Sequence, residues 1–443
     1  MLITNGTLLT MDPRSPLIQS GTLWVEQGQI VDIGPVDRII TGQRGQTVID
    51  AAGKLVMPGL ICAHTHFYGA FARGMSIPGA PPADFVHILE RLWWRLDKAL
   101  DQESVALSAR VCLADAIKHG TTTLIDHHAS PNFIDGSLDV IAQAVWQAGL
   151  RASLCYEVTD RDGAERARAG IRENERFARE AGKSTDDRIA ALFGLHASMT
   201  LSEATLQTCA GLAADLGVGC HIHVAEGDAD VQDSLAKYGC RVVERLHRAG
   251  VLGEKTIAAH CVHVDEREKT ILKQTETNVV HNPRSNMNNA VGIADVPGMF
   301  ERGIVLGLGN DGFSNNMFVE MSVAYLVHKL NTGDPRAMPA DQVVQIAFAH
   351  NAQIAARCGL PRDLGILKKG APADIIIVDY DPTTPLTGGN APWHILFGVD
   401  GTGVETTIVG GQVVMRNRQL LTLDESEMAQ RSRLAAQKIW ERS

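Results

Sequence analysis

Two histidines spaced one residue apart are the first sign of chemistry in this chain. His64 and His66 end an apolar run over residues 55–63. In a β-strand, alternate side chains share a face, so both imidazoles would point to the same side. Neutral imidazole is the commonest metal ligand in proteins, and the pair therefore predicts half of a metal site. A pair with this spacing also fits two surface histidines on a loop.

Polar groups of the same kind recur where later apolar segments end. Further strand candidates cover residues 122–126, 151–156, 190–195, 219–224, 256–260, 278–281 and 305–309. The side chains at or just after their ends that could bind a metal or transfer a proton are His196, His221, His223, Glu226, His260, His281 and Asp311. One such histidine would fit a structural role, but the repetition indicates a shared site.

Helical patterns alternate with these strands, as in residues 102–118, 137–148 and 203–216. Eight strands alternating with helices predict an α/β protein built on a distorted TIM (β/α)8 barrel. Active sites of such barrels lie at the carboxyl ends of the strands. The polar groups at the strand ends are therefore expected to converge.

The two ends of the chain have a different texture. Residues 1–56 contain short strand patterns, including a hairpin around Gly28, and residues 363–422 return to strands. We expect these two ends to pair into one small β-sandwich beside a catalytic barrel over residues 57–362. A final helix is predicted within residues 423–443.

Composition narrows the class of protein. The chain has 443 residues, 45% of them hydrophobic, and a net charge of −10, which argues against nucleic acid as a partner. No apolar run reaches the roughly 18 residues of a membrane span, and the N-terminus lacks a basic signal-peptide region. The eight cysteines are scattered without a C-x-x-C pair, which suits a reducing cytoplasm.

The pattern of strand-end groups resembles the amidohydrolase superfamily over essentially the whole chain. The similarity is to its mononuclear branch of cytosine, guanine and S-adenosylhomocysteine deaminases and triazine hydrolases. Within that branch, three segments are most similar to aminohydrolases associated with bacterial selenium metabolism. They are Leu-Trp-Trp-Arg-Leu-Asp at 92–97, Asp-His-His-Ala-Ser-Pro-Asn at 126–132 and His-Asn-Pro-Arg-Ser-Asn-Met-Asn-Asn at 281–289.

The resemblance implies one divalent metal per chain, with zinc expected and ferrous iron as the alternative. Its ligands would be His64, His66, His223 and Asp311. His223 is preferred to His221 because the family places a glutamate three residues after the metal histidine, and Glu226 fits that position. His221 shares the same strand face, so its role stays open.

Two further implications follow from the same resemblance. Binuclear members carry a bridging lysine on the fourth strand, where this chain has His196, which favours a single metal. Catalytic roles would fall to three residues. Asp311 would take a proton from metal-activated water, Glu226 would protonate a ring nitrogen and the departing ammonia, and His260 would hydrogen-bond the attacking hydroxide and the oxyanion.

Five residues are candidates for substrate contact: His196, His281, His128, Phe67 and Arg73. His281 either lines the pocket or stabilises the turn at Asn282–Pro283. One of His127 and His128 would face the pocket while the other packs. Phe67 and Arg73 follow the first two histidines and either contact a flat ring or pack within their loop. Trp93 and Trp94 are expected in a helix-face core.

Three functions are consistent with these residues. The leading hypothesis is a metal-dependent deaminase of an amino-substituted purine, pterin, pyrimidine or nucleoside. The alternative is a hydrolase that displaces chloride or an alkylamine from a triazine-like ring, but chloride would not need an acid such as Glu226. A non-catalytic binding barrel would show eroded ligands, and none is missing. The partner would be a small heterocycle, and homo-oligomers are a common state of such enzymes.

Overall fold

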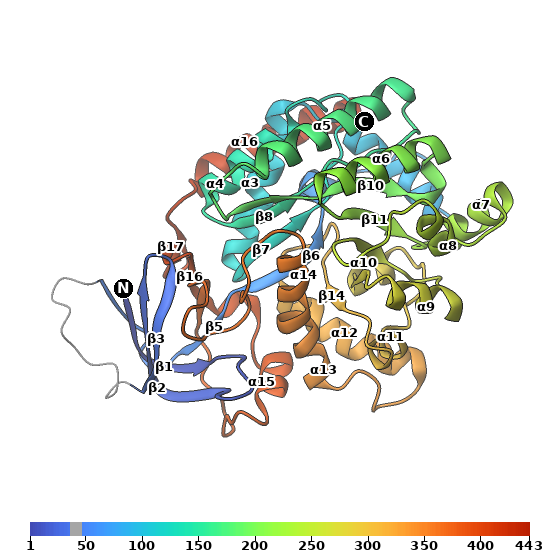
Figure 1. The fold of residues 1–443 in the computed structure, drawn as a ribbon. Helices are drawn as coiled ribbons and strands as arrows, with labels where there is room; N and C mark the ends of the chain where they lie inside the picture. Colours follow the sequence, from blue (N-terminus) through green and yellow to red (C-terminus); the bar gives the residue numbers. More distant parts are fainter. Residues whose placement is uncertain (36–46) are drawn as a thin grey trace.

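The computed structural model describes residues 1–35 and 47–443. The part of the predicted N-terminal strand region that falls on residues 36–46 lies outside the described residues. A (β/α) barrel ringed by helices occupies one side of the molecule, and a small β-structure containing the N-terminus occupies the other (Figure 1). The predicted α/β class, with a distorted barrel and a sandwich made by both chain ends, is confirmed.

The barrel strands are parallel and fall into two sheets, β6-β7-β8-β9 and β10-β11-β12-β13-β14. Their bounds are β6 Leu60–Thr65, β7 Thr121–Asp126, β8 Arg151–Leu154, β9 Ile189–Ala191, β10 Phe193–Ala197, β11 Cys220–Val224, β12 Ile257–His260, β13 Asn278–His281 and β14 Leu306–Leu308. The fourth predicted strand is therefore divided at Leu192. β9 pairs with β8 and β10 pairs with β11, so the division distorts the barrel.

Backbone contacts close both seams between the two sheets. At one seam, Val158 bridges Leu195, and His196 N–H donates to the carbonyl of Val158. At the other seam, Thr65 bridges Asp311, and Asn310 N–H donates to the carbonyl of His64 at 3.0 Å. The second seam fastens the metal-ligand candidate after β14 directly to the strand that carries the two histidines.

The first predicted strand, over residues 55–63, is also two strands. β5 (Leu55–Pro58) belongs to the sandwich and β6 to the barrel. Gly59 N–H leaves the strand direction to donate to the carbonyl of Asp374 at 3.0 Å. A Cβ atom at Gly59 would lie 2.3 Å from the Thr122 side chain, so this crossing requires glycine. The sandwich thus anchors the strand that presents His64 and His66.

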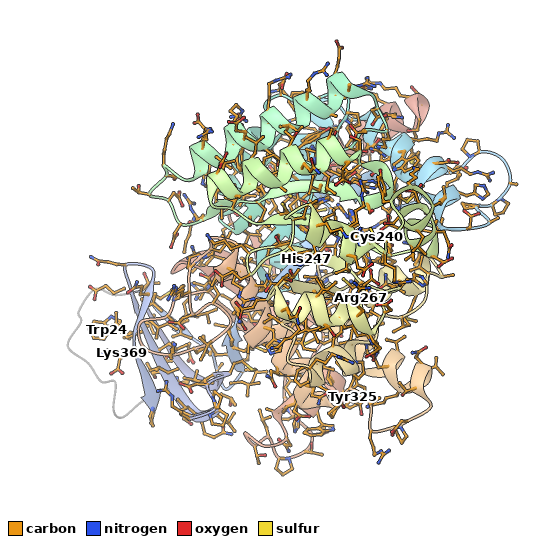
Figure 2. All side chains as sticks on the ribbon, turned by 45° about the vertical axis from the view of Figure 1, so that its right-hand side comes forward. Trp24, Cys240, His247, Arg267, Tyr325 and Lys369 are labelled. Carbon is orange, nitrogen blue, oxygen red and sulfur yellow. The ribbon has the colours of Figure 1, made fainter. Side chains whose placement is uncertain are left out.

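The sandwich is a sheet with the order β18-β17-β16-β15-β5-β1-β2-β3, with β4 paired to β1. Its remaining strands are β1 Leu2–Leu9, β2 Leu17–Glu26, β3 Gln29–Pro35, β4 Val48–Asp50, β15 Ile375–Val378, β16 Val404–Val409, β17 Gln412–Arg416 and β18 Gln419–Leu420. The C-terminal β15 lies between β5 and β16, so both chain ends build this unit. Trp24 and Lys369 mark its position in Figure 2.

The predicted helices form with their expected bounds, and side-chain caps fix the starts of α3, α6 and α16. Asp101 accepts from Ser104 N–H, Ser202 from Thr205 N–H and Asp424 from Glu427 N–H. The α-helices are α1 Phe85–Ile88, α2 Trp94–Ala99, α3 Gln102–Lys118, α4 Ser137–Ala148, α5 Ala164–Ala181, α6 Glu203–Leu216, α7 Asp228–Tyr238, α8 Val242–Arg248, α9 Glu266–Gln274, α10 Pro283–Asn288, α11 Val296–Glu301, α12 Met317–Thr332, α13 Ala340–Gln345, α14 Asn351–Arg357, α15 Ala391–Phe397 and α16 Glu425–Arg442. Among the described residues, no helix is long and apolar enough to cross a membrane.

Candidate metal centre and active site

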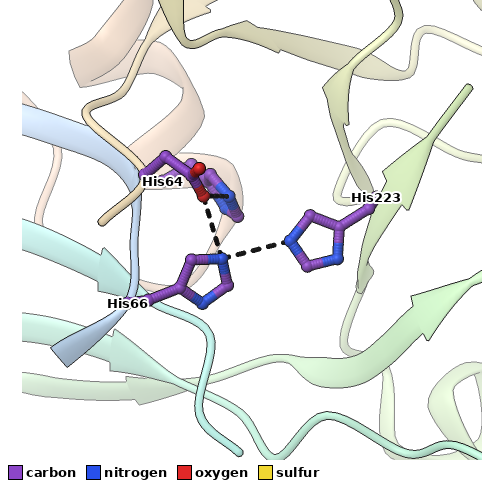
Figure 3. Close-up of side chains that lie close together, drawn as sticks. His64, His66 and His223 are labelled. Atoms are coloured by element: carbon purple, nitrogen blue, oxygen red, sulfur yellow. Dashed lines mark hydrogen bonds and ion pairs between the residues drawn. The ribbon is translucent and has the colours of Figure 1, made fainter. Parts of the chain in front are cut away.

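Four side chains from three barrel strand ends meet at the carboxyl end of the barrel. His64 and His66 come from β6, His223 from β11, and Asp311 follows β14; one ligand atom of each lies within 4.8 Å of all the others. The Nε2 atom of His66 is 3.1 Å from Nε2 of His223 and 3.0 Å from Oδ1 of Asp311 (Figure 3). His64 Nε2 is 3.2 Å from the same oxygen. The structure thus brings together the four predicted ligands.

The tautomers of two histidines show that these residues fit a metal ion. His66 Nδ1 lies 2.6 Å from the carbonyl oxygen of His127, and His223 Nδ1 lies 2.8 Å from that of His196. Each Nδ1 therefore carries the proton and donates it. If both rings are neutral, the two Nε2 lone pairs then face each other at 3.1 Å. Positive charge resolves this contact, either as a proton held by His66 beside Asp311 or as a metal ion.

The electrostatics of the cluster favour the forms that bind metals. Burial lowers the pKa of His64 to about 3 and that of His223 well below its usual value, so both rings are neutral. Burial opposes a charge on His66 too, but the hydrogen bond to Asp311 and its negative charge outweigh it and raise the His66 pKa to about 9. The Asp311 carboxylate therefore attracts positive charge to this point.

A second group of possible ligands overlaps the first. His66, His127, Glu157 and His223 also place one donor atom each within 4.8 Å. His66 and His223 each have only Nε2 free, because Nδ1 donates to a carbonyl. The two groups therefore cannot hold metals at the same time, which supports a single-metal site.

The backbone takes a left-handed conformation at the strand ends that carry the site. The φ angle is 73° at His260, 57° at Asp311 and 46° at Ala225, which precedes Glu226. Such conformations cost roughly 1–3 kcal/mol each for residues other than glycine and persist where surrounding structure holds them. Here Asp311 N–H donates to the carbonyl of His64 at 3.2 Å. These turns orient the side chains of His260, Asp311 and Glu226 towards the site.

Two neighbours hold the ligand candidates in place. His221 is fully buried, and its Nε2 lies 2.8 Å from Nδ1 of His64, so it orients that ring and stays outside the group of four. Ser285, at the start of α10, donates from Oγ to Oδ2 of Asp311 at 2.5 Å. The sequence pattern did not single out Ser285, although it lies in the quoted segment 281–289.

Glu226 and His260 stand beside this cluster. Oε2 of Glu226 is 3.5 Å from Nε2 of His260, and Oε1 accepts from Asn289 Nδ2 at 3.3 Å. Burial and the nearby charge of Asp311 raise the pKa of Glu226 well above its usual value. This shift favours the protonated acid, the form that can donate a proton to a substrate.

A cavity opens beside the ligand candidates, and three of the four line it. It is lined by His66, Tyr68, Phe85, Leu89, Trp93, Trp94, Glu157, His196, Ala197, Met199, His223, Glu226, Gly227, Asp230, Asn289 and Asp311. Trp93 and Trp94, which the sequence placed in a core, form part of its wall. In a chain with 5% aromatic residues, an adjacent pair of tryptophans was the signal that could have found them. Glu157 was also missed.

Only some predicted substrate contacts reach this cavity. His196 lines it, whereas Phe67, His128 and His281 do not. Phe67 is fully buried in the hydrophobic core. His128 lies 2.8 Å from the Ser130 hydroxyl, and His281 lies 3.2 Å from Nε2 of His328, so both rings are packed within the protein. Because these three rings are buried outside the cavity lining, we no longer propose them as substrate contacts.

Arg73 lies in a neighbouring chamber. That chamber shares Trp93, Asn289 and Asp311 with the first cavity. Trp93 therefore stands between the two spaces, and Arg73 faces the second one. A direct contact between Arg73 and a ring held at the four ligand candidates does not follow from this placement.

Comparison with known proteins agrees with the fold and shows the family. The sequence matches the amidohydrolase family over residues 55–414, and the chain belongs to that family. It is 36% identical over 443 residues to a 5'-deoxyadenosine deaminase of Methanosarcina acetivorans, covering 99% of this chain and 98% of the relative. It is 34% identical to a 5-methylthioadenosine/S-adenosylhomocysteine deaminase of Pelotomaculum thermopropionicum, covering 97% and 96%.

Solved structures show the same fold. An adenosine deaminase from Xanthomonas campestris with bound zinc superposes with a TM-score of 0.87 at 23% identity, covering 99% of this chain and 98% of that one. An atrazine chlorohydrolase from Arthrobacter aurescens, complexed with zinc, gives a TM-score of 0.84 at 20% identity, covering 98% and 99%. With the family and its relatives established, the chain is a hydrolase of carbon–nitrogen bonds of the deaminase type, as the sequence predicted.

Proposed function

We propose that this chain is a zinc-dependent deaminase that replaces the amino group of a purine, pterin or related base or nucleoside with oxygen and releases ammonia. The observation that carries the proposal is the position of Glu226. A buried acid, whose pKa is raised by burial and by the charge of Asp311, lines the same cavity as His66, His223 and Asp311, three of the four ligand candidates. Removal of an amino group requires such a proton donor, because ammonia is a far better leaving group than the amide ion.

His64, His66, His223 and Asp311 would hold the metal. Three imidazoles and one carboxylate suit zinc, and ferrous iron remains the alternative. A metal bound there would supply a nucleophile at neutral pH by lowering the pKa of its water towards about 7. The relatives of known structure described with bound zinc support that choice.

The remaining steps belong to the protein's own groups. Asp311 would accept the proton of the attacking water while Ser285 fixes its second oxygen. Glu226 would protonate the ring nitrogen next to the attacked carbon and then the departing ammonia. His260 would hydrogen-bond the oxygen that becomes negatively charged, from a ring that is fully buried.

The cavity walls suit a flat ring. Phe85, Leu89, Trp93, Trp94 and Met199 supply apolar surface around the polar floor. We propose that His196 contacts the substrate, since its Nε2 side reaches the cavity while Nδ1 lies 2.6 Å from Thr200 Oγ1. The relatives named as deaminases of adenine nucleosides support a ring of purine size in this space.

Two coarser properties complete the proposal. Exposed apolar side chains on α12 and α15, which are Leu326, Leu330, Trp393 and Phe397, support the expectation of a homo-oligomer. All eight cysteines are free thiols, seven of them buried, which supports a reducing compartment such as the cytoplasm. For the alternative function on triazine-like rings, the chlorohydrolase structure supplies only a similarity of fold.

Ammonia release tests the proposal. Enzyme loaded separately with zinc and with ferrous iron is incubated with amino-purines, pterins, aminopyrimidines and their nucleosides, beside an Asp311→Asn control loaded in the same way. Release by the wild type that is lost in the control supports the proposal. No release from any substrate by enzyme that holds about one metal per chain would refute it and turn attention to halogenated or N-alkylated rings.

A further inference from the structure

We propose that Glu157 determines substrate specificity by accepting a hydrogen bond from a ring N–H of the heterocycle. This assigns the substrate to rings of the 2-amino-4-oxopyrimidine type, as found in guanine and pterin, and not to adenine-type rings. The inference rests on the proposed deaminase function, because it names the substrate class of the same site. It starts from a buried carboxylate that the proposed mechanism does not use.

Glu157 follows β8 and is 3% exposed, yet it lines the same cavity as Glu226 and His196. One of its oxygens lies within 4.8 Å of a ring nitrogen of both His66 and His223. That distance places the carboxylate at the heterocycle itself, close to the carbon under attack. A ribose attached to the far side of a purine would lie beyond its reach, so ribose hydroxyls are not its partners.

The contacts of Glu157 within the protein leave one of its oxygens without a donor. Oε2 pairs with Nδ1 of His127 at 3.3 Å. Oε1 is 3.7 Å from Nε2 of His196, which is beyond hydrogen-bond distance.

The nearest guanidinium is engaged elsewhere. Arg161 forms ion pairs with Asp97 and Asp162 and stacks on Trp94, with its Cζ 5.1 Å from the ring centroid. Glu157 is therefore not the ion-pair partner of Arg161. Burial opposes its charge, but the imidazoles of His196 and His127 and the guanidinium of Arg161 together hold the pKa of Glu157 below its usual range. The carboxylate is ionised and can only accept hydrogen bonds.

Glu226 and Glu157 thus make opposite demands on one ring. The protonated Glu226 needs a ring nitrogen that accepts, and the ionised Glu157 needs a ring group that donates. In the 2-amino-4-oxopyrimidine ring, the carbon that bears the amino group lies between an acceptor nitrogen and an N–H. A 9-substituted adenine has only acceptor nitrogens in its rings. It would leave Glu157 buried against acceptors, which is strongly unfavourable.

The reaction on such a ring is balanced by water alone. The water oxygen forms a bond to the carbon that bears the amino group, that carbon–nitrogen bond breaks, and the nitrogen leaves as ammonia with one proton of the water. The other proton stays on the ring nitrogen that Glu226 protonates. Glu157 takes no part in these transfers. It holds the ring so that the acceptor nitrogen faces Glu226.

A matched pair of purines tests the inference with the full-length, zinc-loaded enzyme. 9-Methylguanine and 9-methyl-2-aminopurine share the amino carbon and differ by the oxo group with its ring N–H. We expect kcat/KM from ammonia release to be about 10- to 100-fold higher for 9-methylguanine, the effect of one hydrogen bond to a charged group. Glu157→Met should remove most of this difference by slowing only 9-methylguanine. Glu157→Gln should restore part of it, because its amide oxygen still accepts. Zinc content should stay unchanged in both variants.

Four results would overturn the inference. A wild type that deaminates 5'-deoxyadenosine but not 9-methylguanine would reject it and leave the proposed function standing. An equal loss on both purines in Glu157→Met would assign Glu157 a structural role. If Glu157→Met does not fold, a wild-type preference near one between the two purines is sufficient to reject it. If no substrate releases ammonia, both the proposed function and this inference are refuted.

Discussion

Replacing Glu226 by glutamine separates proton donation from every other property of the site. The change preserves shape and, because burial and the charge of Asp311 keep Glu226 protonated, it also preserves the charge of the side chain. Glutamine can still meet Asn289, which lies 3.3 Å from Oε1. Glu226 is not one of the four ligand candidates, so the metal should remain. What is lost is the transfer of a proton to the substrate.

The expected loss is in kcat. Positioned general acids contribute about 10²- to 10⁴-fold, or roughly 3–5 kcal/mol of barrier at 1.36 kcal/mol per tenfold. Since the protonated form is active and its pKa is raised, the wild-type rate should hold below that pKa and fall as the pH rises through it. The alkaline fall should be absent in Glu226→Gln.

The assay is ammonia release from pH 5 to 10 at saturating substrate, with metal content measured in parallel. Glu203→Gln is a suitable control, since the Glu203 side chain is 45% exposed and pairs with Arg245 away from the cavity wall. Full activity in Glu226→Gln, or an unchanged alkaline fall, would refute the role of Glu226 as proton donor.

Three further outcomes follow from the structure. Ser285→Ala removes the 2.5 Å hydrogen bond to Asp311, so its zinc affinity, measured by chelator competition, should fall about 10- to 100-fold. Ser285→Thr keeps a hydroxyl and should bind zinc about as well as the wild type. Equal affinities in all three proteins would show that the hydrogen bond is unimportant. Asp374→Ala removes a 2.9 Å ion pair and leaves Arg151 buried without it, so it should lower the free energy of unfolding by about 3–5 kcal/mol in a thermal unfolding experiment. Asp187 pairs with the exposed side of the same arginine, and Asp187→Ala should lower it by about 1 kcal/mol or less. Similar losses of stability in the two variants would contradict this prediction. Zinc at about 100 times its Kd should stabilise the wild type by about 2.7 kcal/mol and Asp311→Asn by much less, and an equal gain in both would place the zinc elsewhere.

The periodic spacing of apolar residues in the sequence predicted most of the helices and strands. Helices such as α3 and α6 could be placed to the residue because their caps, Asp101 and Ser202, are local signals. The divisions at Gly59 and Leu192 could not be predicted, since each depends on which distant strand the backbone meets. Gly59 turns towards Asp374, more than 300 positions later in the sequence.

Likewise, only some residues of the candidate site could be predicted from the sequence. Groups able to bind a metal could be recognised at the strand ends, but His221 and His223 share one strand face, so the choice of the four ligand candidates came from the family resemblance. Residues that act through three-dimensional contact could not be recognised in this way: Ser285 touches Asp311 from a helix, and Glu157 reaches the cavity from a loop after β8. His281 was misleading because a strand-end position does not reveal that its ring turns to His328.

The most direct measurement is the zinc bound per chain after loading and removal of excess metal, in the wild type, His223→Ala, Asp311→Asn and His247→Ala. His223 and Asp311 belong to the group of four, while His247 is an exposed residue on α8 (Figure 2). The structure predicts about one zinc in the wild type and in His247→Ala, and little in the other two. Retention of a full equivalent by both His223→Ala and Asp311→Asn would contradict the metal site from which the proposed chemistry follows.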